Sequence, residues 1–478
     1  MIGRAVFDNL DAGVERKIVL FLAIVALHVL GALTFIVDAR IPLVLLLTAI
    51  AVVTALERPL WGLGLLIAGR ITSTGANAWF RIGRINIDLF EPSLLLCLGA
   101  LMAHAALHRT QVWRDAPWRT PVVVLLTWQC IGLFWTTDPT GCIKEIAATG
   151  ILLATTLAIL SFARTWEAIR LLVWVWIATS LFVSVASFLG LGASETSSFE
   201  MAQGSREGGF GQHPNWFAMN LSYAVLLSAG VGLAEPRRWL RYSLLLVAAI
   251  VFIAQMQSGS RAGTGSILIS ATMVAVVEPR FRRVALIAGP ILALLIGVVI
   301  WFDLGDAANA FARIFSEGQA GSALLGKSVR VSNWEVCWAE FLDTWGRGIG
   351  GGGYEELLAK YDWWLYTSQY KYPHGVFWGL MAHYGAVGIA AWAAFVVAVL
   401  GMMRDLLRWT ADERVEGAAD LRVVALCMMG SITGYFAWSW VEFLYFEKPF
   451  WEFLGLFTAL WTLTRSRAIA AGVVSELP

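Results

Sequence analysis

Long apolar runs separated by short polar stretches dominate this chain. Fourteen segments stand out, the third of them shorter than a membrane span needs: 18–37, 41–56, 59–69, 89–107, 120–136, 146–164, 167–190, 214–233, 238–257, 262–278, 282–302, 376–402, 423–442 and 446–463. About 20 apolar residues are the length at which an α-helix crosses the hydrocarbon core of a bilayer. Lipid offers the backbone no hydrogen-bond partners, so such runs fold as helices. The pattern therefore predicts an all-α polytopic membrane protein with about 12–14 transmembrane helices.

Composition supports this class and excludes others. Of the 478 residues, 58% are hydrophobic and 14% are charged, and the mean hydropathy is +0.68. The net charge of +1 gives no reason to expect a nucleic-acid partner. The five cysteines are scattered without a CxxC pair, so neither a metal site nor a redox pair is indicated. No small-residue cleavage pattern follows the first apolar run, so we interpret it as a retained helix.

The charges of the loops predict the orientation of the chain. With the N-terminus in the cytoplasm, 21 of the 35 Lys and Arg residues fall inside and 8 fall in short outside loops. The other 6 lie in one long outside segment, which the positive-inside rule does not count. We find no internal repeat and no second soluble domain. The sequence therefore predicts a single integral membrane domain, 1–478, with a long outside loop at 303–375.

The long loop carries a helical pattern of its own. Trp334, Trp338, Phe341 and Trp345 recur at the spacing of one helix face, which predicts a short helix against the membrane surface or the bundle. The glycine-rich stretch 348–353 then breaks this helix. It follows a helix instead of a strand, so a nucleotide-binding loop is only weakly indicated.

His374 is the first candidate for chemistry, because it places a titratable group where this loop meets an apolar run. Such a histidine often serves only as a headgroup contact or a helix-start hydrogen bond. Histidine is also the side chain best suited to accept a proton near neutral pH. Both interpretations stay open on position alone.

Three arginines on the predicted outside face are candidates for binding an anion. Arg261 lies in a Ser-Gly-Ser-Arg-Ala-Gly turn, where small residues and a helix start suit a phosphate group. The alternative is an arginine that reaches lipid headgroups. Arg206 lies in a glycine-rich loop that is either a second clamp or an ordinary connection, and Arg330 stands just before the aromatic helix.

Several common chemistries have no motif in this sequence. There is no Gly-x-Ser-x-Gly elbow, no His-Glu-x-x-His and no Asp-x-Asp pair. A nucleotide-sugar transferase that depends on a metal needs acidic ligands for the metal. The sequence therefore predicts neither a metal nor another cofactor, and any sugar donor outside the cytoplasm has to be lipid-linked.

The region around His374 resembles the O-antigen ligase and Wzy-type polysaccharide polymerase family. The ligase signature is a histidine, then Asn, Ser or Gln, nine residues, a glycine, two residues, and Gly, Thr or Tyr. His374, Gly385 and Gly388 match its first, its glycine and its last positions. The chain departs from it at Gly375, where the family has an amide or a hydroxyl. Three further stretches resemble the family in the same order: 208–215, 258–263, and Arg330 to Gly352.

The resemblance implies a glycosyltransferase-C-like architecture in a bacterial inner membrane, with the active site facing the periplasm. It implies inverting, metal-independent transfer of a glycan from undecaprenyl diphosphate to an acceptor hydroxyl. His374 corresponds to the proposed base, and Arg261 to the arginine that binds the diphosphate, with Arg206 and Arg330 as further clamps. The acceptor is lipid A–core in a ligase and another lipid-linked glycan in a polymerase, and the motifs are shared by both.

Two other classes remain as alternatives. A lipid-linked glycan transporter needs polar groups at bilayer depth on several helices. The candidates for such groups, His28, His104 and Glu442, are few and are not paired by spacing. A purely structural scaffold leaves Arg206, Arg261 and His374 without a role.

Overall fold

The computed structural model describes most of the chain, namely residues 40–72, 80–82, 85–87, 90–110, 116–189, 214–302, 329–361, 372–442, 445 and 447–474. The first predicted apolar segment, 18–37, and the candidate Arg206 lie outside these residues. So do the stretches 303–328 and 362–371 of the predicted long loop.

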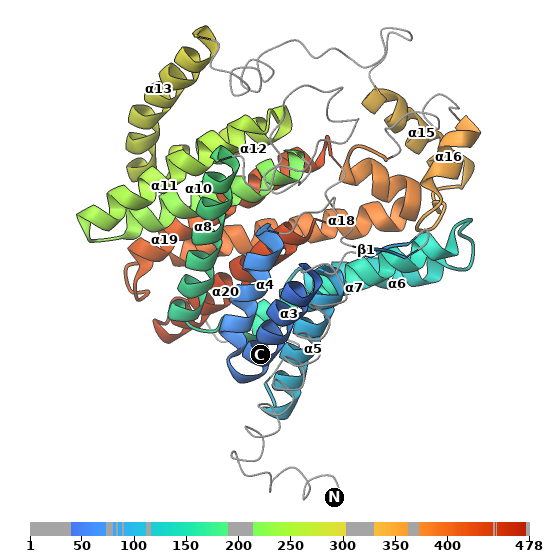
Figure 1. The fold of residues 1–478 in the computed structure, drawn as a ribbon, viewed down its shortest axis with the longest axis horizontal. Coiled ribbons are helices and arrows are strands. Elements are labelled where there is room, and N and C mark those ends of the chain that lie inside the picture. Colours follow the sequence, from blue (N-terminus) through green and yellow to red (C-terminus); the bar gives the residue numbers. More distant parts are fainter. Residues whose placement is uncertain are drawn as a thin grey trace, which may run out of the picture.

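The described part is a bundle of helices (Figure 1). They are α3 (Arg40–Glu57), α4 (Pro59–Thr72), α5 (Phe90–Leu107), α6 (Arg119–Gly132), α7 (Pro139–Phe162), α8 (Trp166–Phe188), α10 (Pro214–Ala234), α11 (Arg238–Gln257), α12 (Arg261–Val277), α13 (Pro279–Trp301), α15 (Val329–Asp343), α16 (Tyr354–Tyr361), α18 (Val376–Trp409), α19 (Ala418–Ser439) and α20 (Lys448–Ala470). Each of the other thirteen predicted apolar segments falls on one of them. Within the described residues, seven helices are long and apolar enough to cross a membrane: α7, α8, α10, α11, α13, α18 and α19. The prediction of an all-α polytopic membrane protein is confirmed at this level.

One short element departs from the all-helical pattern. The strands β1 (Phe80–Ile82) and β2 (Ile85–Ile87) form an antiparallel hairpin in which Phe80 pairs with Ile87. These residues lie between the predicted apolar segments 59–69 and 89–107, where the sequence predicted no regular element. Strands of three residues are too short to produce a recognisable alternation of polar and apolar positions.

Small residues bring α12 and α19 into close contact. A Cβ atom added at Gly430 would lie 3.0 Å from the Ser270 carbonyl oxygen, and one added at Gly434 would lie 2.7 Å from that of Ser266. Glycine and serine four residues apart on facing helices are typical of helix packing in membranes, because they let the backbones approach. This contact fixes the start of α12 beside the end of α19.

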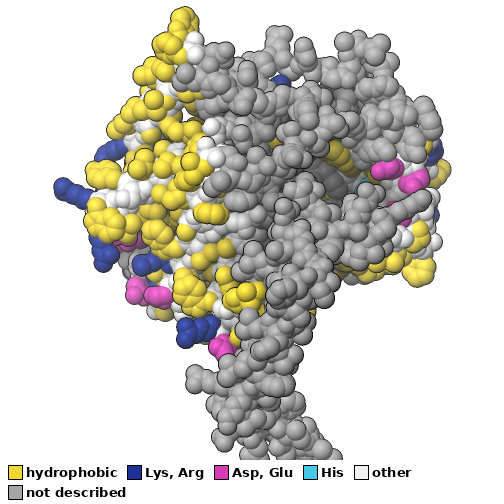
Figure 2. All heavy atoms as spheres, in the orientation of Figure 1, with side chains coloured by type: hydrophobic (Ala, Val, Ile, Leu, Met, Phe, Trp, Pro, Cys, Tyr) yellow, Lys and Arg dark blue, Asp and Glu magenta, His cyan; other side chains and the backbone are white. Residues whose placement is uncertain are grey.

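Helix α13, which follows α12, is an apolar helix with almost no buried side chains. Phe281 and Ile296 are its buried residues, whereas Leu286 and Leu294 are 70% and 69% exposed. Figure 2 shows hydrophobic side chains over much of the described surface on the left of the view, with Lys and Arg at its edge. In a membrane protein such a surface faces lipid.

The helix that follows His374 is broken. At Gly385 the backbone has φ 59° and ψ −147°, which no helical residue adopts. The 24 residues after the break, 386–409, extend roughly 36 Å and are alone long enough to cross a bilayer. The nine residues before it, 376–384, form a separate piece that we call the half-helix. The prediction of one continuous span at 376–402 is wrong in this respect.

Candidate functional site

Side chains from four separate segments meet where α10, α12 and α15 begin and α19 ends. Ser260 Oγ donates a hydrogen bond to Asn215 Oδ1 at 2.9 Å, and Asn215 Nδ2 donates to Glu442 Oε2 at 3.4 Å. Arg330 Nη2 lies 3.8 Å from the same Glu442 oxygen. We call Asn215, Ser260, Arg330, Glu442 and the adjacent His374 the rim cluster.

The backbone of His374 has an unusual conformation that its neighbours hold in place. Its φ is +48°, and Gly375 follows with φ +139°. The His374 carbonyl oxygen accepts a 2.7 Å hydrogen bond from Trp334 Nε1, and the Trp334 ring stacks on Trp378 at 5.4 Å. Non-glycine residues with positive φ cost free energy and persist only where the surroundings determine them. The conformation at His374 is therefore specified by packing on both sides.

The aromatic residues predicted to share one helix face end in different environments. Trp334 turns inward to His374, whereas Trp338 is 51% exposed and Trp345, beyond the end of α15, is 96% exposed. The predicted helix is present, but only its first two turns, which carry Arg330 and Trp334, contact the rim cluster.

The imidazole of His374 is enclosed. The residue is 4% exposed, and the Tyr372 ring lies 4.2 Å from its own ring. Burial and, to a smaller extent, the positive charge of Arg330 together lower the pKa of His374 from its usual 6.5 to about 3. Both effects disfavour the imidazolium. The side chain is therefore neutral near pH 7 and able to accept a proton.

Gly375, the departure from the family signature, has a structural reason in this chain. A Cβ atom there would lie 2.7 Å from the Trp440 carbonyl oxygen and 3.0 Å from Trp378 Cδ1. The segment that carries Trp440 and Glu442 thus lies where a side chain at position 375 would begin. The missing side chain therefore lets the Trp440 backbone pack directly against position 375.

Arg330 and Glu442 form a loose ion pair at the edge of this cluster. The Arg330 side chain is 43% exposed, whereas that of Glu442 is 7% exposed. A pair 3.8 Å apart with one exposed partner contributes little stability. The guanidinium is therefore available to a ligand, and the carboxylate is held by Asn215 as well.

Arg261 is the exposed first residue of α12. The N-cap of the helix is Ser260, whose Oγ accepts from the Gly263 N–H at 3.2 Å while also donating to Asn215. A Cβ at Gly263 would lie 2.8 Å from Ala218 Cβ, so this glycine serves the contact of α12 with α10. The expected role of Gly263 in admitting an anion is not supported. The turn instead ties the position of Arg261 to the rim cluster.

The two signature glycines lie at the break in α18, away from the rim cluster. A Cβ at Gly385 would collide with the Gly346 carbonyl oxygen, which accepts a 2.7 Å hydrogen bond from Ala386 N. A Cβ at Gly388 would lie 2.6 Å from Tyr384 Cβ. Both glycines are therefore required by packing at the break.

The glycine-rich stretch 348–353 packs into this break. The Ile349 N–H donates to the Ala382 carbonyl oxygen at 2.9 Å, and the Gly350 N–H donates to the His383 carbonyl oxygen at 2.8 Å. The Gly352 N–H donates to Glu145 Oε1 at 3.0 Å. These donors are used within the protein, which agrees with the weak indication for a nucleotide-binding loop.

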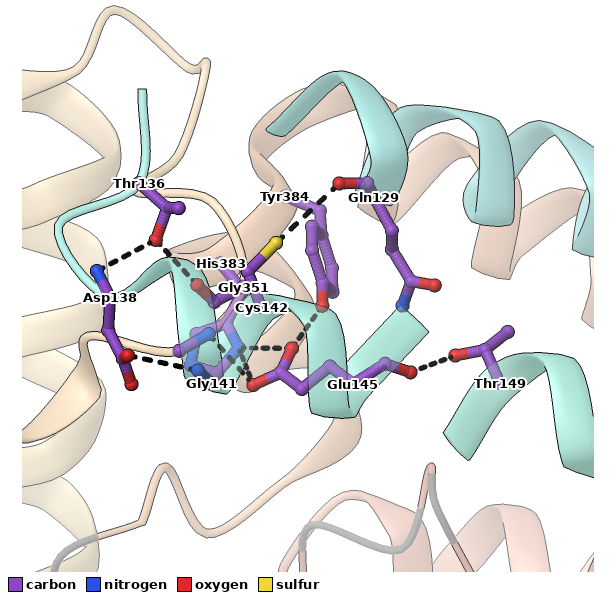
Figure 3. A network of polar contacts seen from close by, with 11 residues as sticks. Gln129, Thr136, Asp138, Gly141, Cys142, Glu145, Thr149, Gly351, His383 and Tyr384 are labelled. Atoms are coloured by element: carbon purple, nitrogen blue, oxygen red, sulfur yellow. Dashed lines mark hydrogen bonds and ion pairs between the residues drawn. The ribbon is translucent and has the colours of Figure 1, made fainter. Parts of the chain in front are cut away.

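A second polar group surrounds Glu145 of α7 (Figure 3). The Tyr384 hydroxyl donates to Glu145 Oε2, and His383 Nδ1 lies 3.3 Å from both carboxylate oxygens. We call Glu145, His383, Tyr384 and Gly352 the Glu145 cluster. It lies at the opposite end of the half-helix from His374.

Among the described residues, no group of three or more His, Cys, Asp or Glu side chains is arranged to hold a metal ion. All five cysteines are free thiols. The ionisable groups that the rim cluster itself offers are an imidazole, a guanidinium and a carboxylate.

Sequence reasoning misplaced one carboxylate and missed another. It named Glu442 as a polar group at bilayer depth, inside an apolar segment, but α19 ends at Ser439, so Glu442 follows the helix and joins the rim cluster. Glu145 was not singled out, because its partners His383 and Tyr384 are more than 200 residues away. The available signal was an acidic residue next to a long apolar run, which is costly unless it is paired.

No family model matches the chain, and no curated protein matches it. What the protein does must therefore be inferred from the rim cluster and the residues that support it.

Proposed function

We propose that this protein is a membrane glycosyltransferase that moves a glycan from undecaprenyl diphosphate to an acceptor hydroxyl at the periplasmic face of a bacterial inner membrane. The observation that carries the proposal is the position of a buried, neutral histidine close to Arg330, which in turn pairs with Glu442. A base, an anion-binding cation and a carboxylate are the groups that such a transfer uses.

In the proposed reaction, His374 takes the proton of the acceptor hydroxyl as its oxygen attacks the anomeric carbon. The bond from that carbon to the diphosphate oxygen breaks, and the lipid diphosphate leaves with the bonding electrons. Attack from the opposite side inverts the anomeric configuration. A pKa of about 3 makes His374 a weak base in the free protein. A diphosphate bound beside Arg330 would offset the positive charge that lowers this pKa and strengthen the base when the donor is present.

The arginines supply the charge that stabilises the leaving group. Arg330 is half-exposed and only loosely paired, and Arg261 is exposed at the start of α12 beside Ser260. Fixed guanidinium groups are effective here because the negative charge on the diphosphate grows as the bond breaks. Arg206 remains a prediction as a further clamp.

Two acceptors fit this chemistry. An O-antigen ligase uses lipid A–core, and a polysaccharide polymerase uses the end of another lipid-linked glycan. The signature spacing after His374 favours the ligase. The Trp440 backbone occupies the space where a ligase has a polar side chain at position 375, which favours the polymerase. We take the ligase as the first assignment and the polymerase as its alternative.

A transporter of lipid-linked glycans is the second candidate function. One observation favours it. Arg70 Nε lies 3.6 Å from Glu452 Oε1, and both side chains are buried in helices of the bundle. Buried charge pairs inside membrane helices are typical of transport pathways. The transferase accounts for His374, which the transporter leaves without a role.

The test is glycan transfer by purified protein in lipid nanodiscs, supplied with undecaprenyl diphosphate carrying one or several repeat units and with lipid A–core. The His374→Ala variant is expected to lose about 100- to 10,000-fold in rate, the usual contribution of a base. His108→Ala, which removes an exposed histidine after α5, is the matched control and is expected to keep full activity.

The products separate the candidates. Glycan joined to lipid A–core indicates the ligase, and longer glycan on undecaprenyl diphosphate indicates the polymerase. Transfer by His374→Ala at the rate of the unaltered protein would remove the base from the proposal. Translocation of the donor in vesicles without any new glycosidic bond would establish the transporter instead.

A further inference from the structure

The carboxylate of Glu145 is surrounded by donors from two distant segments (Figure 3). The Gly352 N–H lies 3.0 Å from Oε1, the Tyr384 hydroxyl donates to Oε2, and His383 Nδ1 lies 3.3 Å from each oxygen. The Glu145 side chain is 17% exposed and that of His383 is 5% exposed. A partly buried carboxylate with three donors holds the segments that supply those donors in one arrangement.

These segments are the end of the half-helix, just before the break in α18, and the glycine-rich stretch that packs into the break. A helix broken at Gly385 leaves the carbonyl oxygens of the preceding turn without their usual N–H partners. Those of Ala382 and His383 accept from the glycine-rich stretch, and that of Tyr384 accepts from Trp128 Nε1 at 2.9 Å. Three carbonyl oxygens next to the break are therefore bonded, and Glu145 joins α7 to both the half-helix and the stretch beside it.

The half-helix has His374 just before its first residue and the Glu145 cluster at its end. Nine helical residues extend roughly 13 Å. A rotation of about 5° at the cluster would move His374 by about 1 Å over this length, treating the helix as a rigid rod. A displacement of that size at a reacting group is enough to cost about 100-fold in rate.

We propose that Glu145 is a positioning residue, which orients the half-helix so that His374 faces the acceptor hydroxyl. The inference rests on the proposed function, because it assumes that His374 acts on a substrate. Glu145 itself touches no reacting atom. It acts through His383 and Tyr384, and a change at Glu145 affects the reaction by moving the half-helix.

A carboxylate suits this role better than an amide. Its two oxygens accept from Gly352 and Tyr384 at the same time and also face His383. Glutamine at this position has one acceptor oxygen, so one of these donors would lose its partner. Glu145→Gln is therefore expected to loosen the cluster partially, and Glu145→Ala fully.

The experiment compares Glu145→Ala with His374→Ala and with the double variant, in the full chain in nanodiscs. Glu145→Ala is expected to lower kcat about 100-fold. The KM for the lipid-linked donor is expected to change less than about threefold, because Arg261 and Arg330 lie on other helices. In the His374→Ala background, Glu145→Ala is expected to add less than about threefold, because residues that act as a unit are not additive.

A readout without catalysis accompanies the kinetics. Amide hydrogen exchange of residues 376–384 is expected to rise at least about tenfold in Glu145→Gln, because local opening exposes amides in proportion to its population. The matched control is Glu278→Gln, which alters a buried carboxylate that caps α13 at the far end of α12. It is expected to leave both exchange in the half-helix and kcat unchanged. Tyr384→Phe, which removes a single hydroxyl, replaces Glu145→Ala if that variant fails to insert.

The outcomes distinguish the two proposals. Unchanged hydrogen exchange in the half-helix would overturn the positioning role and leave the transferase intact. The same holds if the kcat loss of the double variant equals the product of the losses of Glu145→Ala and His374→Ala. Full activity of His374→Ala together with a loss in Glu145→Ala would overturn the base instead. Raised exchange, a kcat effect and non-additivity together support the positioning role.

Discussion

Restoring the family's side chain at position 375 is expected to damage this protein rather than improve it. Gly375 has φ +139°, and a Cβ there would lie 2.7 Å from the Trp440 carbonyl oxygen and 3.0 Å from Trp378 Cδ1. A side chain in such a backbone conformation costs about 1–3 kcal/mol. Overpacking adds about 1–3 kcal/mol. The two costs together come to about 4 kcal/mol. A cost of that size would make the active arrangement roughly 1000-fold less populated.

The strain would be relieved by moving the segment that carries Trp440 and Glu442. Because Glu442 contacts Asn215 and Arg330, its displacement opens the rim cluster. We therefore expect Gly375→Ser to lower the initial rate of glycan transfer by about 100- to 1000-fold. At 1.36 kcal/mol for each tenfold change in rate, this corresponds to about 3–4 kcal/mol of strain, the lower to central part of the range above.

Two variants control this measurement. Gly375→Ala adds the Cβ without the hydroxyl and is expected to match Gly375→Ser, because the cost is steric. Gly297→Ala adds a Cβ in α13 that has no heavy atom within 4 Å and is expected to be neutral. A rate for Gly375→Ser above that of Gly375→Ala would refute the reasoning, because the hydroxyl would then be contacting substrate as the family signature implies.

Two further predictions concern His374 and the break in α18. Because burial lowers the pKa of His374 to about 3, the neutral base persists well below its usual pKa of 6.5, so kcat/KM is expected to stay level from about pH 7.5 to about pH 5. A decline centred near pH 6.5 in a pH–rate profile would contradict this if it disappears in His374→Ala. Gly385→Ala is expected to lower the thermal midpoint in detergent, because its Cβ collides with the Gly346 carbonyl oxygen, whereas Gly265→Ala in the open part of α12 is expected to be neutral or stabilising. Equal midpoints for the two alanine variants would show that the break is not required.

The helices of this protein were predictable because their signal is local. Each apolar run near 20 residues carries its own evidence, and lipid permits no other backbone arrangement. The position of His374 just before such a run was predictable in the same way, and the structure has it two residues before α18. The roles of His374, Arg261 and Arg330 in catalysis stay predictions.

The parts that sequence could not provide depend on distant contacts. The break at Gly385 lies inside a continuous apolar run, and the Gly346 carbonyl that requires it is supplied by another segment. Glu145 and His383 are 238 residues apart, so no periodicity links them. From the sequence, Gly375 was only a departure from the family signature, and the position of the Trp440 backbone gives it a physical reason.

The break in α18 makes sense as a solution to a geometric conflict. A continuous helix of 34 residues would extend roughly 51 Å, whereas the hydrocarbon core needs only about 30 Å. The additional turns would carry His374 straight out of the bundle, away from Arg330 and Glu442. Ending the span at Gly385 lets the half-helix take a different direction. The glycine-rich stretch and Trp128 then bond carbonyl oxygens that the break exposes. Glu145 joins α7 to that stretch and to the end of the half-helix, so the carboxylate that holds the two sides of this arrangement together also sets the direction of the half-helix and, through it, the position of His374.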